Sequence, residues 1–285
     1  MDVQGFVAAG FEPVRECFAE ILGRQPGTGL AFAAWSDGRW LADLWGGYAD
    51  LGRHRPWQAG SLVQPYSVSK PFAAICALRL AEAGRLDLDA PVQRYWPQFR
   101  APATVRHVLS HQAGVVLLDQ PVATEAFYDW DYLCGLLAAQ EPAWEPGTAH
   151  GESALFYGHL VGELVRRVDG RGVGQFLREE ICGPHGLDFA FGLSPGMLAE
   201  AVAPQSTGRD QVFGEDNTWG LGFGIDADGY GMGGLGGSYG GTSTAGGYTV
   251  GFLTGTVGGS DRAEALENTL RGCLGVPPLT ATGAG

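Results

Sequence analysis

Strand-like and helical segments are unevenly distributed along the 285 residues of this chain, and their order limits the folds that it can adopt. Apolar residues at helical spacing predict a helix over residues 9–22. Two strand-like runs follow, around Gly29–Trp35 and Trp40–Trp45, and Ser36-Asp37-Gly38 between them is typical of a hairpin turn. From about residue 67 to residue 200 the pattern is mostly helical.

The last third of the chain is rich in glycine, with 17 glycines between Gly220 and Gly259. The glycine content alone would fit a flexible linker. Large apolar residues interleave with the glycines, which favours short strands with tight turns instead: Trp219, Leu221, Phe223, Ile225, Tyr239, Tyr248, Val250 and Phe252. A helix is expected over about residues 260–274, and residues 277–285 are expected to form a frayed tail.

This order of elements predicts an α/β fold of the α+β kind. Both ends of the chain would build one antiparallel sheet, the terminal helices would cover it, and the middle would be a helical insertion. The chain is then a single domain over residues 1–285, with a sheet region of residues 1–60 and 215–276 and a helical region of residues 61–214. A cleft is expected between the sheet and the insertion.

Composition excludes several classes of function. The chain has 18 basic and 31 acidic residues, and a net charge of −13 argues against nucleic acid or an anionic membrane as a partner. No apolar run approaches the roughly 18 residues of a membrane span. The first residues lack the basic and apolar parts of a signal peptide. Five scattered cysteines form no metal-binding spacing, so we expect a reduced, cytoplasmic protein without structural zinc.

A single lysine, Lys70, accompanies 17 arginines. Arginine stays protonated, whereas a desolvated lysine is able to act as a neutral base, although chance explains such a bias as well. Ser67 lies three residues before Lys70 at the expected start of a helix, so the hydroxyl and the amine would share one face. A serine hydroxyl needs an adjacent base to become a nucleophile. The spacing therefore predicts Ser67 as nucleophile and Lys70 as its base.

Four further segments accompany Ser67-Val68-Ser69-Lys70. They are DLWGGYAD from Asp43, AGRLDLDAPV from Ala83, TVRHVLSHQAG from Thr104 and WEPGT from Trp144. Together these motifs resemble the serine β-lactamase superfamily, and more narrowly its class C-like members, the family VIII carboxylesterases and related acyltransferases. The resemblance extends over nearly the whole chain. It implies a β-lactamase/transpeptidase-like fold and a serine-dependent enzyme that needs no cofactor.

The resemblance breaks down at three places. Relatives carry a tyrosine shortly after the Pro-Gly-Thr turn, where the register places Glu152 in this chain. Their third motif, Lys-Thr-Gly or His-x-Gly, reads Met232-Gly233-Gly234 here. The chain is also shorter than the family esterases between Gln205 and Trp219. That would leave a more open cleft, or a surface covered by a second copy in a homodimer.

The resemblance also implies a set of site residues. Ser67, Lys70 and Glu152 are the expected catalytic residues, and the backbone N–H groups of Ser67 and Leu235 are the expected oxyanion hole. The expected substrate pocket has six further residues: Tyr66, His150, Ser153, Met232, Gly233 and Gly234.

Two histidines and two tryptophans are candidates for other roles. His107 and His111 are four residues apart, a spacing that can bind metal on a helix. The family register places both in a structural turn, so no metal is expected. Trp130 and Trp144 could line an apolar acyl pocket, but large aromatic side chains belong more often to the core.

Three functions remain open at this point. The first is an acyl hydrolase or acyltransferase that acts on a small ester, amide or thioester, a carrier-bound acyl group included, through an acyl-Ser67 intermediate; Glu152 then replaces the tyrosine as proton shuttle. The second is a repurposed biosynthetic enzyme in which Glu152 and Lys70 perform acid–base chemistry without an acyl-serine. The third is a catalytically inactive binding protein.

Overall fold

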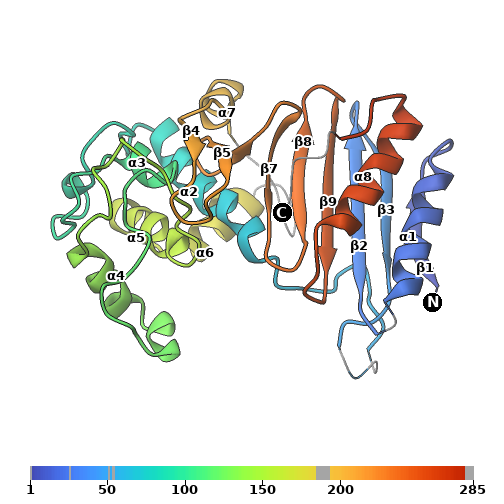
Figure 1. Cartoon of the computed structure of the whole chain (residues 1–285), viewed down its shortest axis with the longest axis horizontal. Coiled ribbons are helices and arrows are strands. Elements are labelled where there is room, and N and C mark those ends of the chain that lie inside the picture. Colours follow the sequence, from blue (N-terminus) through green and yellow to red (C-terminus); the bar gives the residue numbers. More distant parts are fainter. Residues whose placement is uncertain (1, 26, 51, 53–54, 184–192, 280–285) are drawn as a thin grey trace. The chain divides into compact units, whose positions relative to one another are not determined.

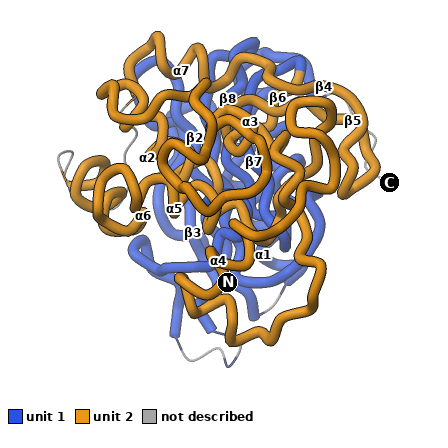
Figure 2. Tube along the Cα trace, turned by 90° about the vertical axis from the view of Figure 1, so that its left-hand side faces the viewer, with its two compact units in different colours: residues 1–69, 227–285 blue, residues 70–226 orange. Residues whose placement is uncertain are grey.

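The computed structural model describes residues 2–25, 27–50, 52, 55–183 and 193–279 (Figure 1). They divide between two compact units, of residues 1–69 with 227–285 and of residues 70–226 (Figure 2). Both ends of the chain therefore contribute to unit 1. The sequence predicted boundaries after residues 60 and 214, and the division into units falls after residues 69 and 226. The three short strands near residues 206–225 belong to unit 2.

Unit 1 contains an antiparallel sheet in the order β1-β3-β2-β9-β8-β7. Its strands are β1 (Val3–Val7), β2 (Leu30–Ser36), β3 (Arg39–Gly46), β7 (Gly229–Gly233), β8 (Tyr239–Ser243) and β9 (Tyr248–Thr254). Phe32 of β2 lies opposite Leu44 on one side and Phe252 on the other, so the two chain ends pair directly. This confirms the predicted fold class. The edge strand β1 escaped sequence analysis because three of its five residues are exposed.

Two helices, α1 (Glu12–Arg24) and α8 (Asp261–Leu274), pack side by side on the sheet of unit 1 (Figure 1). Phe18 of α1 and Leu266 of α8 are fully buried in the same apolar cluster as Phe32 and Phe252. Burying one apolar face of each helix and of the sheet supplies the main stabilisation of such a layered unit.

The segment after α8 is not frayed at its start, contrary to expectation. Arg271 Nε donates to the carbonyl of Pro277, and the backbone N–H of Leu279 donates to Asn268 Oδ1 at 2.7 Å. These bonds dock residues 277–279 on α8, because the helix side chains satisfy backbone groups that a free tail would leave to solvent. The remaining tail residues lie outside the described part.

Unit 2 is mainly helical. Its α-helices are α2 (Lys70–Glu82), α3 (Val105–Leu109), α4 (Trp130–Ala139), α5 (Tyr157–Asp169), α6 (Val173–Phe176) and α7 (Pro195–Ala201). Short 3₁₀ helices lie at Val92–Arg94 and Thr124–Tyr128, and a π-helix at Leu177–Cys182. Its strands are β4 (Ser206–Arg209), β5 (Asp216–Trp219) and β6 (Gly224–Ile225). The stretch between Gln205 and Trp219 contains the β4–β5 hairpin. Among the described residues, the helices are all too short or too polar to cross a membrane.

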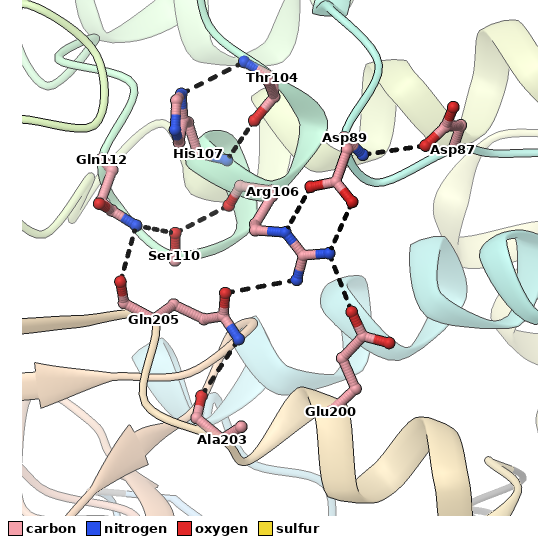
Figure 3. Close-up of polar contacts among 10 residues, drawn as sticks. All are labelled: Asp87, Asp89, Thr104, Arg106, His107, Ser110, Gln112, Glu200, Ala203 and Gln205. Carbon is pink, nitrogen blue, oxygen red and sulfur yellow. Dashed lines mark hydrogen bonds and ion pairs between the residues drawn. The ribbon is translucent and has the colours of Figure 1, made fainter.

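Arg106 of α3 joins three separate segments of unit 2 (Figure 3). Its guanidinium donates to both Asp89 carboxylate oxygens, at 2.7 and 3.0 Å, and to Glu200 at 2.9 Å. It also donates to Gln205 Oε1 at 3.3 Å. His107 closes the start of α3 by accepting from the backbone N–H of Thr104. The turn predicted as structural therefore anchors the chain where it enters β4.

Substituting Phe18→Ala tests the core of unit 1. We expect a loss of about 3–5 kcal/mol in the free energy of unfolding, because a fully buried aromatic side chain is removed and a cavity remains. Urea denaturation measures the loss. The exposed Glu16 on the same helix provides the control, and Glu16→Ala is expected to change stability by no more than about 0.5 kcal/mol. Equal effects of both variants would contradict this description of the core.

Candidate active site

Ser67 and Lys70 lie at a junction of two helical segments. Tyr66–Ser69 forms a 3₁₀ turn at the end of the first part of unit 1, and α2 of unit 2 begins at Lys70 without interruption. Tyr66 has a φ of +52°, a left-handed conformation that is uncommon outside glycine. Ser69 Oγ donates to the Tyr66 carbonyl at 2.6 Å and closes the turn. Strained backbone of this kind is frequent at functional sites.

Unit 2 brings two of the predicted catalytic residues together. Lys70 Nζ and Glu152 Oε1 are 2.8 Å apart, and the two side chains are only 7% and 13% exposed. Such a buried ion pair is stable only when the two charged groups are close together and well oriented, because desolvating each charge costs free energy. The carboxylate therefore lies at the lysine, where the family register places the side chain of a tyrosine.

Three consecutive N–H groups fix the backbone around Glu152. Gly151 N donates to the His111 carbonyl at 3.1 Å, Glu152 N donates to Asp210 Oδ2 at 3.0 Å, and Ser153 N donates to His111 Nδ1 at 3.1 Å. The helix α5 begins only at Tyr157, after this irregular segment. Sequence analysis missed Asp210, because no motif surrounds it.

Two of the residues predicted to line the pocket, His150 and Ser153, are buried in unit 2. His150 is 4% exposed, and its Nε2 is 2.9 Å from Asn217 Oδ1 on β5. Ser153 is also 4% exposed, and its hydroxyl donates to the carbonyl of Val115 at 3.3 Å. Both side chains satisfy buried polar groups, which is a structural role.

His111 occupies the interior of unit 2. It is 2% exposed and has a φ of +60°, and its ring packs 4.4 Å from that of Trp219 and 4.7 Å from that of Tyr157, between ring centroids. Burial, followed by the positive charge of Lys70, lowers its pKa to about 3. Its Nδ1 accepts from Ser153, so the neutral ring carries its proton on Nε2. Nε2 has no hydrogen-bond partner among the described residues.

The two tryptophans considered for an acyl pocket are held by polar partners in unit 2. Trp130 Nε1 donates to the buried Glu163 at 2.8 Å, and the indole packs against His159. Trp144 Nε1 donates to the Gln112 carbonyl at 3.3 Å. The described part of the chain contains no cluster of three His, Cys, Asp or Glu residues able to hold a metal ion.

The third motif lies in unit 1 at the end of β7. Met232 is 6% exposed and pairs with Gly240, whereas Leu235 is 69% exposed. Gly234 N donates to the Ser238 carbonyl at 2.7 Å, which closes the turn that carries Leu235. A Cβ atom at Gly234 would lie 2.4 Å from the carbonyl oxygen of Pro65. Only glycine therefore lets this turn approach the segment that carries Ser67.

The buried histidine predicts a pH dependence of stability. The unfolded chain takes up a proton at His111 near pH 6.5, but the folded chain does so only near pH 3, so stability falls as the pH drops through this window. His111→Asn keeps a residue that tolerates positive φ and removes this titration. We expect the urea midpoint of the variant to vary less with pH than that of the wild type.

Measurements from pH 6.5 down to about pH 4.5 separate this effect from most carboxylate titration. His107 and His159 also have pKa values lowered by burial, and they contribute equally to both proteins. An unchanged slope in His111→Asn would mean that His111 takes up its proton at the same pH in the folded and the unfolded chain.

Comparison with known proteins places this geometry in a family. The family model described as Beta-lactamase matches residues 14–197. The esterase/beta-lactamase LipL of Mycobacterium tuberculosis is 34% identical over 218 residues, which are 71% of this chain and 49% of LipL. A D-aminopeptidase of Cereibacter sphaeroides is 28% identical over 205 residues, which are 69% of this chain and 37% of that protein. The chain thus spans about half or less of these relatives.

Solved structures resemble the chain over nearly its whole length. The crystal structure of a family VIII carboxylesterase has a TM-score of 0.88 and 28% identity, covering 96% of this chain and 100% of the other. A penicillin-binding protein homologue from Caulobacter crescentus has a TM-score of 0.87 and 26% identity, with the same coverage of 96% and 100%. The fold, the SxxK junction and the matched residues agree, and the chain belongs to the beta-lactamase family.

Proposed function

We propose that this chain is a serine acyl hydrolase that cleaves a small ester through an acyl-Ser67 intermediate. The observation that carries the proposal is the helical junction at which Ser67 lies three residues before Lys70, whose buried side chain is paired with Glu152. Relatives named as esterase, carboxylesterase and D-aminopeptidase support hydrolysis of an acyl bond.

The Lys70–Glu152 pair supplies the base as a unit. Ser67 Oγ attacks the acyl carbon while its proton passes to Lys70, and Lys70 passes a proton to Glu152, so the pair gains one proton in total. When the tetrahedral intermediate collapses, the acyl C–O bond breaks and that proton goes to the leaving alkoxide. A water molecule then attacks the acyl-serine with the same pair as base, which releases the acid and restores Ser67.

The third motif, Met232-Gly233-Gly234, supports an ester substrate that has no charged group facing Met232. Met232 is apolar and buried where relatives have lysine or histidine, and no charged residue occurs between Gly229 and Gly247. The N–H groups of Ser67 and Leu235 are proposed to bind the developing oxyanion, because Gly234 brings their two segments together in unit 1. An alcohol in place of water as the acceptor would make the same site an acyltransferase.

One observation favours a second candidate. The ion pair between Glu152 and Lys70 is itself able to move a proton to and from a bound metabolite, without an acyl-serine. The mechanism of this candidate differs from that of the first in having no covalent intermediate. A test for the covalent adduct therefore separates the two.

The proposed function is tested by labelling Ser67. Incubation with a fluorophosphonate is expected to add one phosphonyl group, which peptide mass spectrometry locates at Ser67, and p-nitrophenyl acetate is expected to be turned over. Ser67→Ala should lose both properties while keeping the wild-type melting temperature. Turnover of p-nitrophenyl acetate by Ser67→Ala at the wild-type rate would reject the acyl-serine mechanism.

A pair of adjacent glycines tests the oxyanion hole. Gly234→Ala places a methyl group against Pro65 and Val68, whereas a Cβ at Gly233 meets nothing within 4 Å. We expect Gly234→Ala to lower kcat for p-nitrophenyl acetate by about 10²-fold, the scale for loss of one oxyanion donor. Gly233→Ala is the comparison variant: Gly233 belongs to the expected substrate pocket, so its methyl group is expected to change KM and to leave kcat near that of the wild type. Similar kcat values for both variants would remove Leu235 from the mechanism.

A further inference from the structure

Asp210 is a buried carboxylate of unit 2 that has no role in the sequence motifs. It follows β4 directly and is 0% exposed. Its Oδ1 accepts from the N–H groups of Val212 and Phe213, at 2.8 and 2.9 Å. Its Oδ2 accepts from Glu152 N at 3.0 Å and from Asn217 Nδ2 at 3.2 Å. Both oxygens therefore have two donors each, and the side chain is fixed in its rotamer.

Hydrogen bonds hold this carboxylate in its charged form. Burial raises the pKa of Asp210, but the surrounding N–H donors outweigh that effect, so its pKa lies below that of an ordinary aspartate. No arginine, lysine or histidine of the described residues forms an ion pair with it within 4 Å. Burying a charged carboxylate costs desolvation free energy, which its N–H donors offset. The same hydrogen bonds hold those N–H groups in fixed positions.

Glu152 depends on this carboxylate together with His111. Asp210 holds the N–H of Glu152, while His111 holds the N–H groups before and after it. The backbone on both sides of Glu152 is thereby fixed, and only the torsions of its side chain remain free. Those torsions bring Oε1 to 2.8 Å from Lys70 Nζ.

The two residues that hold this backbone are also joined to each other through their elements. Gln112, next to His111, donates to the Gln205 carbonyl at 3.3 Å (Figure 3). Ser206 Oγ donates to the Ser110 carbonyl at 3.5 Å. The turn after α3 and the start of β4 thus form one connected support. Movement of the hairpin would be passed directly to the Glu152 backbone.

We propose that Asp210, together with His111, is a positioning residue that sets the geometry of the Lys70–Glu152 ion pair. The kinetic consequence of this proposal rests on the proposed function, but the structural consequence does not. Asp210→Asn keeps the size of the side chain and replaces one oxygen by an NH₂ group. That group faces two N–H donors in either orientation, so two of the four hydrogen bonds are lost.

The single lysine makes the structural test direct. Protein labelled with ¹³Cε-lysine gives one signal, from Lys70, at a fixed pH. Glu152→Gln defines the signal of Lys70 without its carboxylate partner. We expect Asp210→Asn to move the signal toward that of Glu152→Gln. Thr218→Ala, which removes the Thr218–Thr207 bond of the same hairpin, is the matched control and is expected to leave the signal in place.

The kinetic test uses p-nitrophenyl acetate. We expect Asp210→Asn to lower kcat by about 10²-fold with KM unchanged, the scale for misplacing a catalytic group by 1 Å. In a Glu152→Gln background it should cause no further loss, because both changes act through one group. A merely structural role would instead give equal losses in both backgrounds and a similar loss in Thr218→Ala.

The outcomes separate this proposal from the proposed function. A wild-type lysine signal in Asp210→Asn overturns the positioning role, whatever the activity. If Asp210→Asn shifts the lysine signal and the wild-type protein turns over no ester, the positioning role is supported and the hydrolase is rejected. If Asp210→Asn does not fold, His111→Asn tests the other contact, because it removes the ring nitrogen that accepts from Ser153 and keeps a residue that tolerates positive φ.

Discussion

The buried ion pair between Lys70 and Glu152 is the interaction on which unit 2 is organised. Removing two charges from water costs several kcal/mol for each ion, and their attraction repays this only when distance and orientation are closely controlled. The 2.8 Å separation meets that requirement. An apolar pair of the same size would often be at least as stable, so stability alone does not account for a pair of this kind, and the proposed proton transfer gives it a role.

The protein controls the geometry of the pair through backbone hydrogen bonds. Glu152 belongs to an irregular segment, where a glutamate side chain would normally sample many positions. Asp210 and His111 remove the backbone part of that freedom by holding the peptide groups at and beside Glu152, so only its side-chain torsions remain free. Both side chains are buried in the interior of unit 2, and His111 stays neutral because burial depresses its pKa. Rigid support of this kind reduces the reorganisation that a proton transfer requires.

In unit 1, two backbone segments approach each other closely at Gly234. The turn after β7 carries Leu235, and the strained turn at Tyr66 carries Ser67. Glycine at 234 lets them meet without a Cβ between them. Unit 1 thereby brings two candidate oxyanion donors onto neighbouring segments, while the helices α1 and α8 and their core hold the sheet in place.

Local patterns in the sequence determined the order of helices and strands, the SxxK junction and the position of Glu152 after the Pro-Gly-Thr turn. Each of these depends on residues close together in the chain, where periodicity and spacing are informative. The support of Glu152 was not predictable in this way. His111 and Asp210 are 42 and 58 residues away from their partners, and His150 and Ser153 are buried by contacts of the same long range. Only the tertiary structure brings such groups within hydrogen-bond distance, because a sequence pattern encodes the faces of its elements but not which distant faces meet.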